Sequence, residues 1–166
     1  IATAKRLGAV VEATDLRPTA KEQVEALGGN GLDVPMSDEE KQRAAEAAKS
    51  GYGWQPGEQY IKDQAAIVDK AVSNADIVST TALIPGRNAP RLIKAETVAK
   101  MKPGSVILDM AVETGGNVEG SKEGETVVTE NGVKILGIPN IPGTVATEAS
   151  ALYARNVFNF LETLFD

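Results

Sequence analysis

Two carboxylates and a pair of glycines gather in residues 109–117, which follow an apolar, β-branched run. Such a run is typical of a buried strand that delivers its last residues to a loop. Asp109 and Glu113 have the chemistry of a general acid and base pair, but we expect both to make structural hydrogen bonds instead. Gly115 and Gly116 would permit a ligand to approach the backbone closely. The segment is therefore a candidate binding loop.

Another acidic residue, Asp15, follows a short apolar run at 10–13 that we predict to be a buried strand. In a dinucleotide-binding unit, an acidic residue at this place accepts hydrogen bonds from the adenosine ribose hydroxyls. It also repels a 2′-phosphate, which favours NAD over NADP. The alternative is that Asp15 caps the helix predicted to begin at Pro18. The sequence leaves these two interpretations open.

A third candidate segment is TTALIPG, residues 80–86, in which a predicted strand ends in two threonines and a Pro-Gly turn. Its small residues would let a ligand lie against the backbone, and Pro85 restricts the conformation of the loop. The alternative is an ordinary turn between a strand and a loop.

The hydrophobic pattern predicts the elements that would position these segments. Helices alternate with short, continuous apolar strands, which indicates a Rossmann-like, doubly wound α/β fold with a mostly parallel sheet. In such a fold, ligands bind beyond the carboxyl ends of the strands, where all three candidate segments lie. We predict helices over 1–7, 18–27, 38–49, 58–74, 93–101 and 144–165, and strands over 10–13, 76–80, 105–109 and both sides of an Asn-Gly turn at 130–132.

Helical periodicity also predicts which side chains of the two longest helices are buried. Each of these helices has aliphatic or aromatic residues at intervals of three to five positions, and we expect that face to pack against the sheet. The residues expected to point inward are Ile61, Ala65, Val68, Val72, Leu152, Val157, Phe160 and Leu164.

Composition excludes several classes of function. The chain of 166 residues contains neither Cys nor His, so we expect no thiol nucleophile, no metal site and no catalytic general base within it. Its net charge of −6 disfavours nucleic acid and anionic membrane surfaces as partners. No apolar run approaches the roughly 20 residues that span a bilayer, so we expect no direct membrane insertion.

Residues 30–57 differ from the rest of the chain because they are rich in Gly, Glu, Lys and Ala and hold few large aliphatic side chains. We interpret this stretch as a mobile loop or insertion that contains a short helix with Ser37 as its N-cap. The sequence opens with Ile1, inside a predicted helix. We therefore expect an incomplete dinucleotide-binding domain over 1–166, whose first strand and Gly-rich loop lie upstream.

The motifs, taken together, resemble one family. LGAVVEATDLR, KEQVEALGG, DIVSTTALIPGRNAP, MKPGSVILDMAVETGGN and ENGVKILG follow one another as they do in the α subunit of proton-translocating NAD(P) transhydrogenases, which share their fold with alanine dehydrogenases. The resemblance covers essentially the whole chain. It implies a domain that holds NAD(H) while a partner domain holds NADP(H), with hydride passing directly between the two nicotinamides.

The resemblance also implies site residues. Asp15, Leu16 and Arg17 match the segment that contacts the ribose and adenine. Gly51 and Tyr52 match a loop that closes over the nucleotide. Further matches to cofactor-contacting positions are Gln64, Thr81, Ala82, Leu83, Glu113 and Asn140, the last two near the nicotinamide.

The implied setting is a larger complex. We expect the NADP(H)-binding domain and the membrane domain of the transhydrogenase as partners, and a homodimer of this chain. We expect a cytoplasmic location, peripheral to the bacterial inner membrane through the complex. Two alternatives remain open: an alanine-dehydrogenase-like NAD-dependent oxidoreductase, and a module that binds a partner protein without a cofactor.

Overall fold

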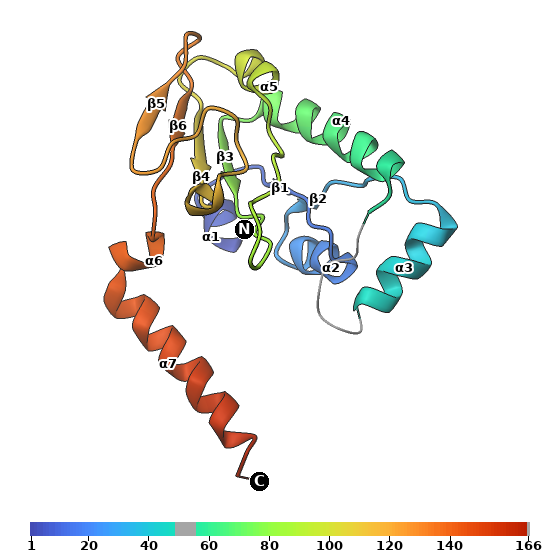
Figure 1. Cartoon of the computed structure of the whole chain (residues 1–166), viewed down its shortest axis with the longest axis vertical. Helices are drawn as coiled ribbons and strands as arrows, with labels where there is room; N and C mark the ends of the chain where they lie inside the picture. Colours follow the sequence, from blue (N-terminus) through green and yellow to red (C-terminus); the bar gives the residue numbers. More distant parts are fainter. Residues whose placement is uncertain (49–55, 166) are drawn as a thin grey trace. The chain divides into compact units, whose positions relative to one another are not determined.

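The apolar runs form strands in two sheets, one in each of two units of the chain (Figure 1). Unit 1 is Ile1–Asn74 and unit 2 is Ala75–Asp166. The computed structural model describes residues 1–48 and 56–165. In each sheet, neighbouring strands that are distant in sequence run parallel.

Unit 1 is mainly helical and contains a two-stranded parallel sheet. Its strands β1 and β2 pair with Glu12 opposite Asn30 and Ala13 opposite Gly31. The elements of the unit are α1 (Ala2–Arg6), β1 (Glu12–Ala13), α2 (Pro18–Ala26), β2 (Asn30–Gly31), α3 (Asp38–Ala48) and α4 (Glu58–Asn74).

Helix α3 begins where the sequence predicted it, and the reason is a reciprocal cap. The backbone N–H of Glu40 donates to Ser37 Oγ at 3.2 Å, and the backbone N–H of Ser37 donates to Glu40 Oε2 at 3.0 Å. This arrangement satisfies two N–H groups that have no partner within the helix. Ala44 on α3 and Tyr60 on α4 then form a buried cluster, so part of segment 30–57 is folded and packed.

Unit 2 is built around a four-stranded sheet with strand order β3-β4-β6-β5. Strands β3, β4 and β6 are parallel, and only β5 runs antiparallel, to β6. This is the mostly parallel sheet that the sequence predicted. The elements are β3 (Ile77–Thr80), α5 (Ala95–Lys100), β4 (Val106–Asp109), a short 3₁₀ helix η1 (Val112–Thr114), β5 (Thr126–Val128), β6 (Lys134–Leu136), α6 (Ile141–Thr144) and α7 (Ala146–Glu162).

The core of unit 2 lies at the two central strands. Ile107 on β4 and Ile135 on β6 are paired in register and fully buried. Ile93 was predicted to begin a helix, but it forms a parallel β-bridge with Val118 and is buried there. The helix α5 therefore begins two residues later, at Ala95.

Two predictions of burial in unit 1 are only partly confirmed. Val10 is 84% exposed because β1 contains only Glu12 and Ala13 and does not extend back to it. In α4, Val72 is buried as predicted and Val68 is half-buried, but Ile61 and Ala65 are exposed. Near the start of the helix the contact with Ala44 of α3 buries Tyr60 instead. The periodicity therefore predicted the bounds of α4 and the burial of its second half, but not the burial of its first turns.

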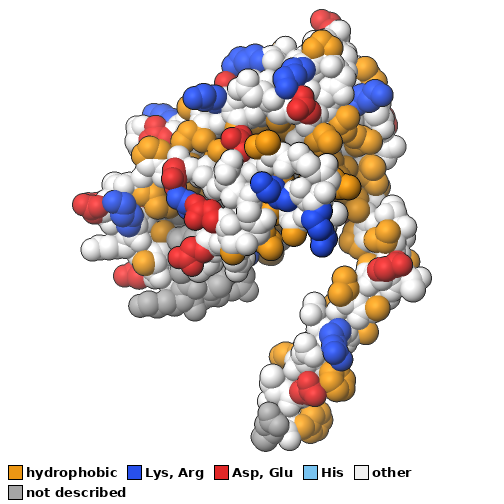
Figure 2. Space-filling view, turned by 180° about the vertical axis from the view of Figure 1, so that it is seen from behind, with side chains coloured by type: hydrophobic (Ala, Val, Ile, Leu, Met, Phe, Trp, Pro, Cys, Tyr) orange, Lys and Arg blue, Asp and Glu red, His pale blue; other side chains and the backbone are white. Residues whose placement is uncertain are grey.

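The expected inward face of α7 is also exposed. Leu152, Val157, Phe160 and Leu164 are between 40% and 70% exposed, and no residue of α7 is buried. Figure 2 shows hydrophobic side chains on the surface of this helix. An apolar stripe determines how a helix could pack, but it does not supply the surface against which it packs.

Candidate functional site

The carboxyl ends of three parallel strands bring together the site residues predicted in unit 2. Residues 81–83 follow β3, Glu113 lies in η1 shortly after β4, and Asn140 follows β6. Because β3, β4 and β6 are adjacent and parallel, their carboxyl ends lie at one edge of the sheet. In open α/β sheets, ligands bind beyond this edge.

The loop after β3 has a defined course. The backbone N–H of Arg87 donates to the carbonyl of Ile84 at 3.1 Å, and Gly86 has a φ of 72°. With Pro85 at the second position, these values describe a type II turn. Leu83, directly before the turn, leaves 57% of its surface exposed.

Glu113 and Asn140 are in direct contact. The backbone N–H of Asn140 donates to Glu113 Oε2 at 3.2 Å. Asn140 has a φ of 45° and a ψ of 49°, in the left-handed region, and its Oδ1 accepts a hydrogen bond from the N–H of Gly143 at 3.3 Å. A residue other than Gly rarely adopts this conformation, and Asn does so more readily than most. Both side chains are exposed, so the pair can meet a ligand.

Asp109 and Asn117 were part of a predicted loop but were not predicted as site residues. Both are fully buried. Asp109 Oδ1 accepts hydrogen bonds from Thr80 Oγ1 and two backbone N–H groups, which confirms its expected structural role. The signal available in the sequence was a carboxylate at the end of an apolar strand, a position where an unpartnered charge would be very unfavourable.

Gly116 was predicted to let a ligand approach the backbone, but it makes room for a side chain instead. It has a φ of 81°, and a β-carbon on it would lie 2.5 Å from Asp109 Oδ2. The close approach that it permits is therefore to a side chain of the same loop. Gly115, with a φ of 97°, has no heavy atom within 4 Å of the position of a β-carbon.

In unit 1, Asp15 and Arg17 form a two-point ion pair after β1. Arg17 Nε donates to Asp15 Oδ1 at 3.0 Å and Arg17 Nη2 donates to Asp15 Oδ2 at 2.9 Å. These hydrogen bonds are the main reason that the pKa of Asp15 lies below its ordinary value, and partial burial opposes them. The alternative in which Asp15 caps α2 is wrong, because Arg17 is the N-cap and α2 has no side-chain cap bond.

The other predicted site residues from the sequence of unit 1 are Leu16, Gly51, Tyr52 and Gln64. Leu16 packs against the cluster of Ala44 and Tyr60, which anchors the chain between the two charged residues of the ion pair. Burial raises the pKa of Tyr60, and the carboxylates of Glu40 and Asp15 raise it further. Gln64 is half-buried on α4. Gly51 and Tyr52 lie outside the described residues.

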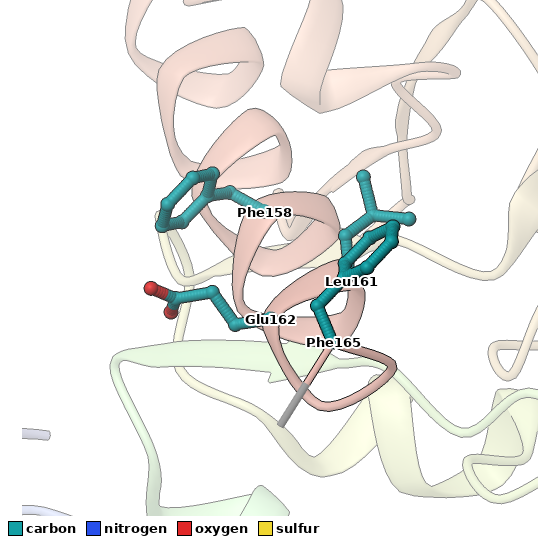
Figure 3. Close-up of a pocket in the computed structure, with 4 residues that line it drawn as sticks. All are labelled: Phe158, Leu161, Glu162 and Phe165. Atoms are coloured by element: carbon teal, nitrogen blue, oxygen red, sulfur yellow. The ribbon is translucent and has the colours of Figure 1, made fainter.

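A hollow that the structure describes lies away from these residues. It is an open depression on α7 and the residues directly after it, lined by Phe158, Leu161, Glu162 and Phe165 (Figure 3). None of the predicted site residues lines it. A shallow apolar surface of this kind lacks the convergent polar groups of a small-molecule site.

A comparison with protein families decides the affiliation of the chain. The family described as "Alanine dehydrogenase/PNT, C-terminal domain" matches residues 1–166. The chain belongs to this family. Membership agrees with the resemblance recognised in the sequence motifs. The family includes both alanine dehydrogenases and transhydrogenases.

Individual relatives agree with the family assignment. An NAD(P) transhydrogenase alpha-subunit protein from Rhodospirillum rubrum is 55% identical over 161 residues, which cover 97% of this chain and 41% of that protein. The crystal structure of transhydrogenase from Sinorhizobium meliloti is 45% identical with a TM-score of 0.72, and the match covers 98% of this chain and 40% of that one. An L-alanine dehydrogenase structure is 27% identical with a TM-score of 0.67, over 96% of this chain and 38% of that one.

These similarities confirm the predicted Rossmann-like fold class. The chain spans about two-fifths of the length of the relatives named above. Across residues 1–48 and 56–165, no helix combines the length and the apolar character needed to cross a membrane.

Proposed function

We propose that this chain is the NAD(H)-binding part of a proton-translocating transhydrogenase. The observation that carries the proposal is the contact between Glu113 and Asn140 at the sheet edge where residues 81–83 also emerge. The similarity to transhydrogenase subunits along almost the whole chain supports it.

The chemistry of these side chains fits a nicotinamide dinucleotide. The exposed Leu83 offers an apolar contact to a flat ring, and the exposed Glu113 carboxylate offers acceptors to ribose hydroxyls. The Asn140 side chain carries both an acceptor and donors, which match a carboxamide. The bound nicotinamide would supply the hydride chemistry, and the chain would supply position and electrostatics.

Asp15 is assigned to the adenosine ribose. Its lowered pKa keeps the carboxylate ionised at neutral pH, and about one third of the side chain is exposed. Among the described residues, Asp15 Oδ2 accepts one hydrogen bond, from Arg17, which leaves a second lone pair for a hydroxyl donor. A ribose 2′-phosphate at the same place would meet this negative charge, so NAD(H) is favoured over NADP(H).

No residue of the chain is assigned to proton transfer. Hydride passing between two nicotinamides requires no base at the reacting carbon, so the task of Glu113 and Asn140 is to orient the ring and its ribose. In the proposed setting, an NADP(H)-binding domain and a membrane domain are the partners. The chain would act as a homodimer on the cytoplasmic side of the inner membrane, and segment 30–57 would belong to the nucleotide site.

The test is cofactor selectivity in the full-length protein that contains this chain. Isothermal titration with NADH and NADPH should show much tighter binding of NADH. Asp15→Ala should weaken NADH by roughly 10- to 100-fold, which corresponds to about 1.5–3 kcal/mol for a lost hydrogen bond to a charged group.

Glu25→Ala is the matched control. It removes another acidic side chain from unit 1, one that is largely exposed, pairs with Lys21 and lies outside segment 30–57, and it leaves the Asp15–Arg17 pair intact. Equal affinity of the wild type for NADH and NADPH, or an equal loss in both variants, would refute the assignment of Asp15.

The alanine-dehydrogenase-like alternative has structural support of its own, because the L-alanine dehydrogenase fold matches 96% of the chain. The two functions differ in the hydride donor. Reduction of NAD⁺ by L-alanine would favour the dehydrogenase, and reduction of NADP⁺ by NADH would favour the transhydrogenase. A folded protein that binds neither nucleotide would favour the partner-binding module.

A further inference from the structure

Two buried polar side chains join the loops that follow β3 and β4. Asp109 is the last residue of β4, and Asn117 lies eight residues later, beyond the Gly-Gly pair. Both are fully buried, and all their hydrogen bonds described below are to groups of unit 2. Buried polar groups with so many partners fix the local backbone firmly.

Asp109 holds the β4 loop to itself and to the end of β3. Its Oδ1 accepts from Thr80 Oγ1 at 3.3 Å, from the N–H of Ala111 at 3.0 Å and from the N–H of Asn117 at 3.2 Å. Its Oδ2 accepts from the N–H of Val118 at 3.1 Å. All four contacts use the carboxyl group as an acceptor, so an amide in its place would set a donor against a donor or lose a bond.

Asn117 holds the β3 loop. Its Oδ1 accepts from the N–H of Ala82 at 3.0 Å, and its Nδ2 donates to the carbonyls of Ala82 at 2.9 Å and Pro90 at 2.8 Å. Both main-chain polar groups of Ala82 are therefore bonded to one side chain. The N–H of Ala89 donates to the carbonyl of Thr114 at 2.8 Å, which gives the two loops a further connection.

This geometry fixes the site residues against one another. Ala82 lies between Thr81 and Leu83, and Thr114 directly follows Glu113. Rotation of Ala82 would break its bonds to Asn117 and would turn both neighbouring side chains. The clamp of Asp109 and Asn117 thus couples residues 81–83 on one strand end to the Glu113 loop on the next.

We propose that Asp109 and Asn117 are positioning residues for hydride transfer, which set the place of residues 81–83 relative to Glu113. The inference rests on the proposed function, because it assigns the clamp to the nicotinamide end of that site. A misplacement of about 1 Å at a reacting centre can lower a rate on the order of a hundredfold. The clamp should therefore influence the rate constant more than the affinity.

The test is Asn117→Asp in the full-length protein within its complex. The variant keeps the size of the side chain but places an oxygen opposite the carbonyls of Ala82 and Pro90, where acceptors repel one another. We expect the NADH-to-NADP⁺ hydride-transfer rate at saturating nucleotides to fall on the order of a hundredfold, with a far smaller change in NADH affinity. Lower pH should restore part of the rate, because the protonated carboxyl can donate again.

Asn131→Asp is the matched control. Asn131 Nδ2 also donates to backbone carbonyls, those of Val98, Ala99 and Met101 at 3.1–3.3 Å, so the same substitution creates the same repulsion. Asn131 lies before β6 begins, at the strand end opposite the candidate site. This variant should lose stability but keep its hydride-transfer rate per folded molecule.

Three outcomes decide the inference. A normal rate in folded Asn117→Asp would overturn it, and so would an equal loss per folded molecule in Asn131→Asp. If Asn117→Asp does not fold, Asp109→Asn keeps the acceptor Oδ1 and alters only the contact with Val118. That variant should fold but transfer hydride at a reduced rate, and a full hydride-transfer rate would overturn the inference.

A wild type that neither binds NADH nor transfers hydride would refute the proposed function itself.

Discussion

Gly116→Ala should destabilise the protein far more than Gly115→Ala, although the two glycines are neighbours and both have a positive φ. At Gly115 the new β-carbon meets no heavy atom within 4 Å, so only the left-handed conformation is unfavourable. That term is about 1–2 kcal/mol. The neighbouring glycine therefore serves as a matched control for backbone strain.

At Gly116 a second term is added. The β-carbon would lie 2.5 Å from Asp109 Oδ2, and this oxygen accepts the hydrogen bond from the N–H of Val118. Asp109 is fully buried and cannot turn towards solvent. Loss of a hydrogen bond to a buried charged group contributes about 1.5–3 kcal/mol. The expected total for Gly116→Ala is therefore about 2.5–5 kcal/mol.

The measurement is urea-induced unfolding of both variants and the wild type, followed by circular dichroism. The difference between the two alanine variants reports the contact with Asp109, because the backbone term is common to both. Equal free energies of unfolding for the two variants would show that the carboxylate moves aside easily. The clamp would then be less rigid than its hydrogen bonds indicate.

Two further predictions concern unit 1. Because Arg17 lowers the pKa of Asp15, the ion pair stabilises the fold at pH values above the ordinary pKa of an aspartate, and this stabilisation is lost as the pH falls through the lowered pKa. In Arg17→Met, the Asp15 carboxyl should titrate at higher pH by NMR. The stability loss should be at most about 1 kcal/mol, because the pair is partly exposed. Ser37→Ala should lower the stability of α3 by about 1 kcal/mol in thermal unfolding, because it removes the hydroxyl that accepts from the N–H of Glu40. Ser37→Thr keeps this hydroxyl and should change the stability little, so equal losses in the two variants would contradict the capping role.

Local sequence signals predicted most of the elements. The apolar runs gave β3 and β4, the Asn-Gly turn gave the β5–β6 hairpin, and α4 begins and ends at the predicted residues. These features depend on neighbours in sequence, and so the chain itself reveals them. The burial of particular faces was less predictable, because Tyr60 and Ile93 owe their burial to partners elsewhere in the chain.

In the candidate site, too, local features could be predicted from the sequence and long-range contacts could not. Residues 81–83 and Glu113 could be located from the sequence because they follow strands whose carboxyl ends share one edge, whereas Asn140 was indicated only by the family resemblance. The bonds of Asn117 to Ala82 join residues 35 positions apart. No periodicity or turn signal encodes such a contact, because it depends on the course of two loops at once.

The close approach of Gly116 to Asp109 has a consequence for how this sequence can evolve. A side chain at position 116 is tolerable only after the carboxylate at position 109 has gone, and loss of that carboxylate leaves four donors without their acceptor. Each substitution alone destabilises the protein. The second substitution is less destabilising once the first is present, so the two effects are not additive. Sequence drift through one substitution at a time is therefore blocked at this pair.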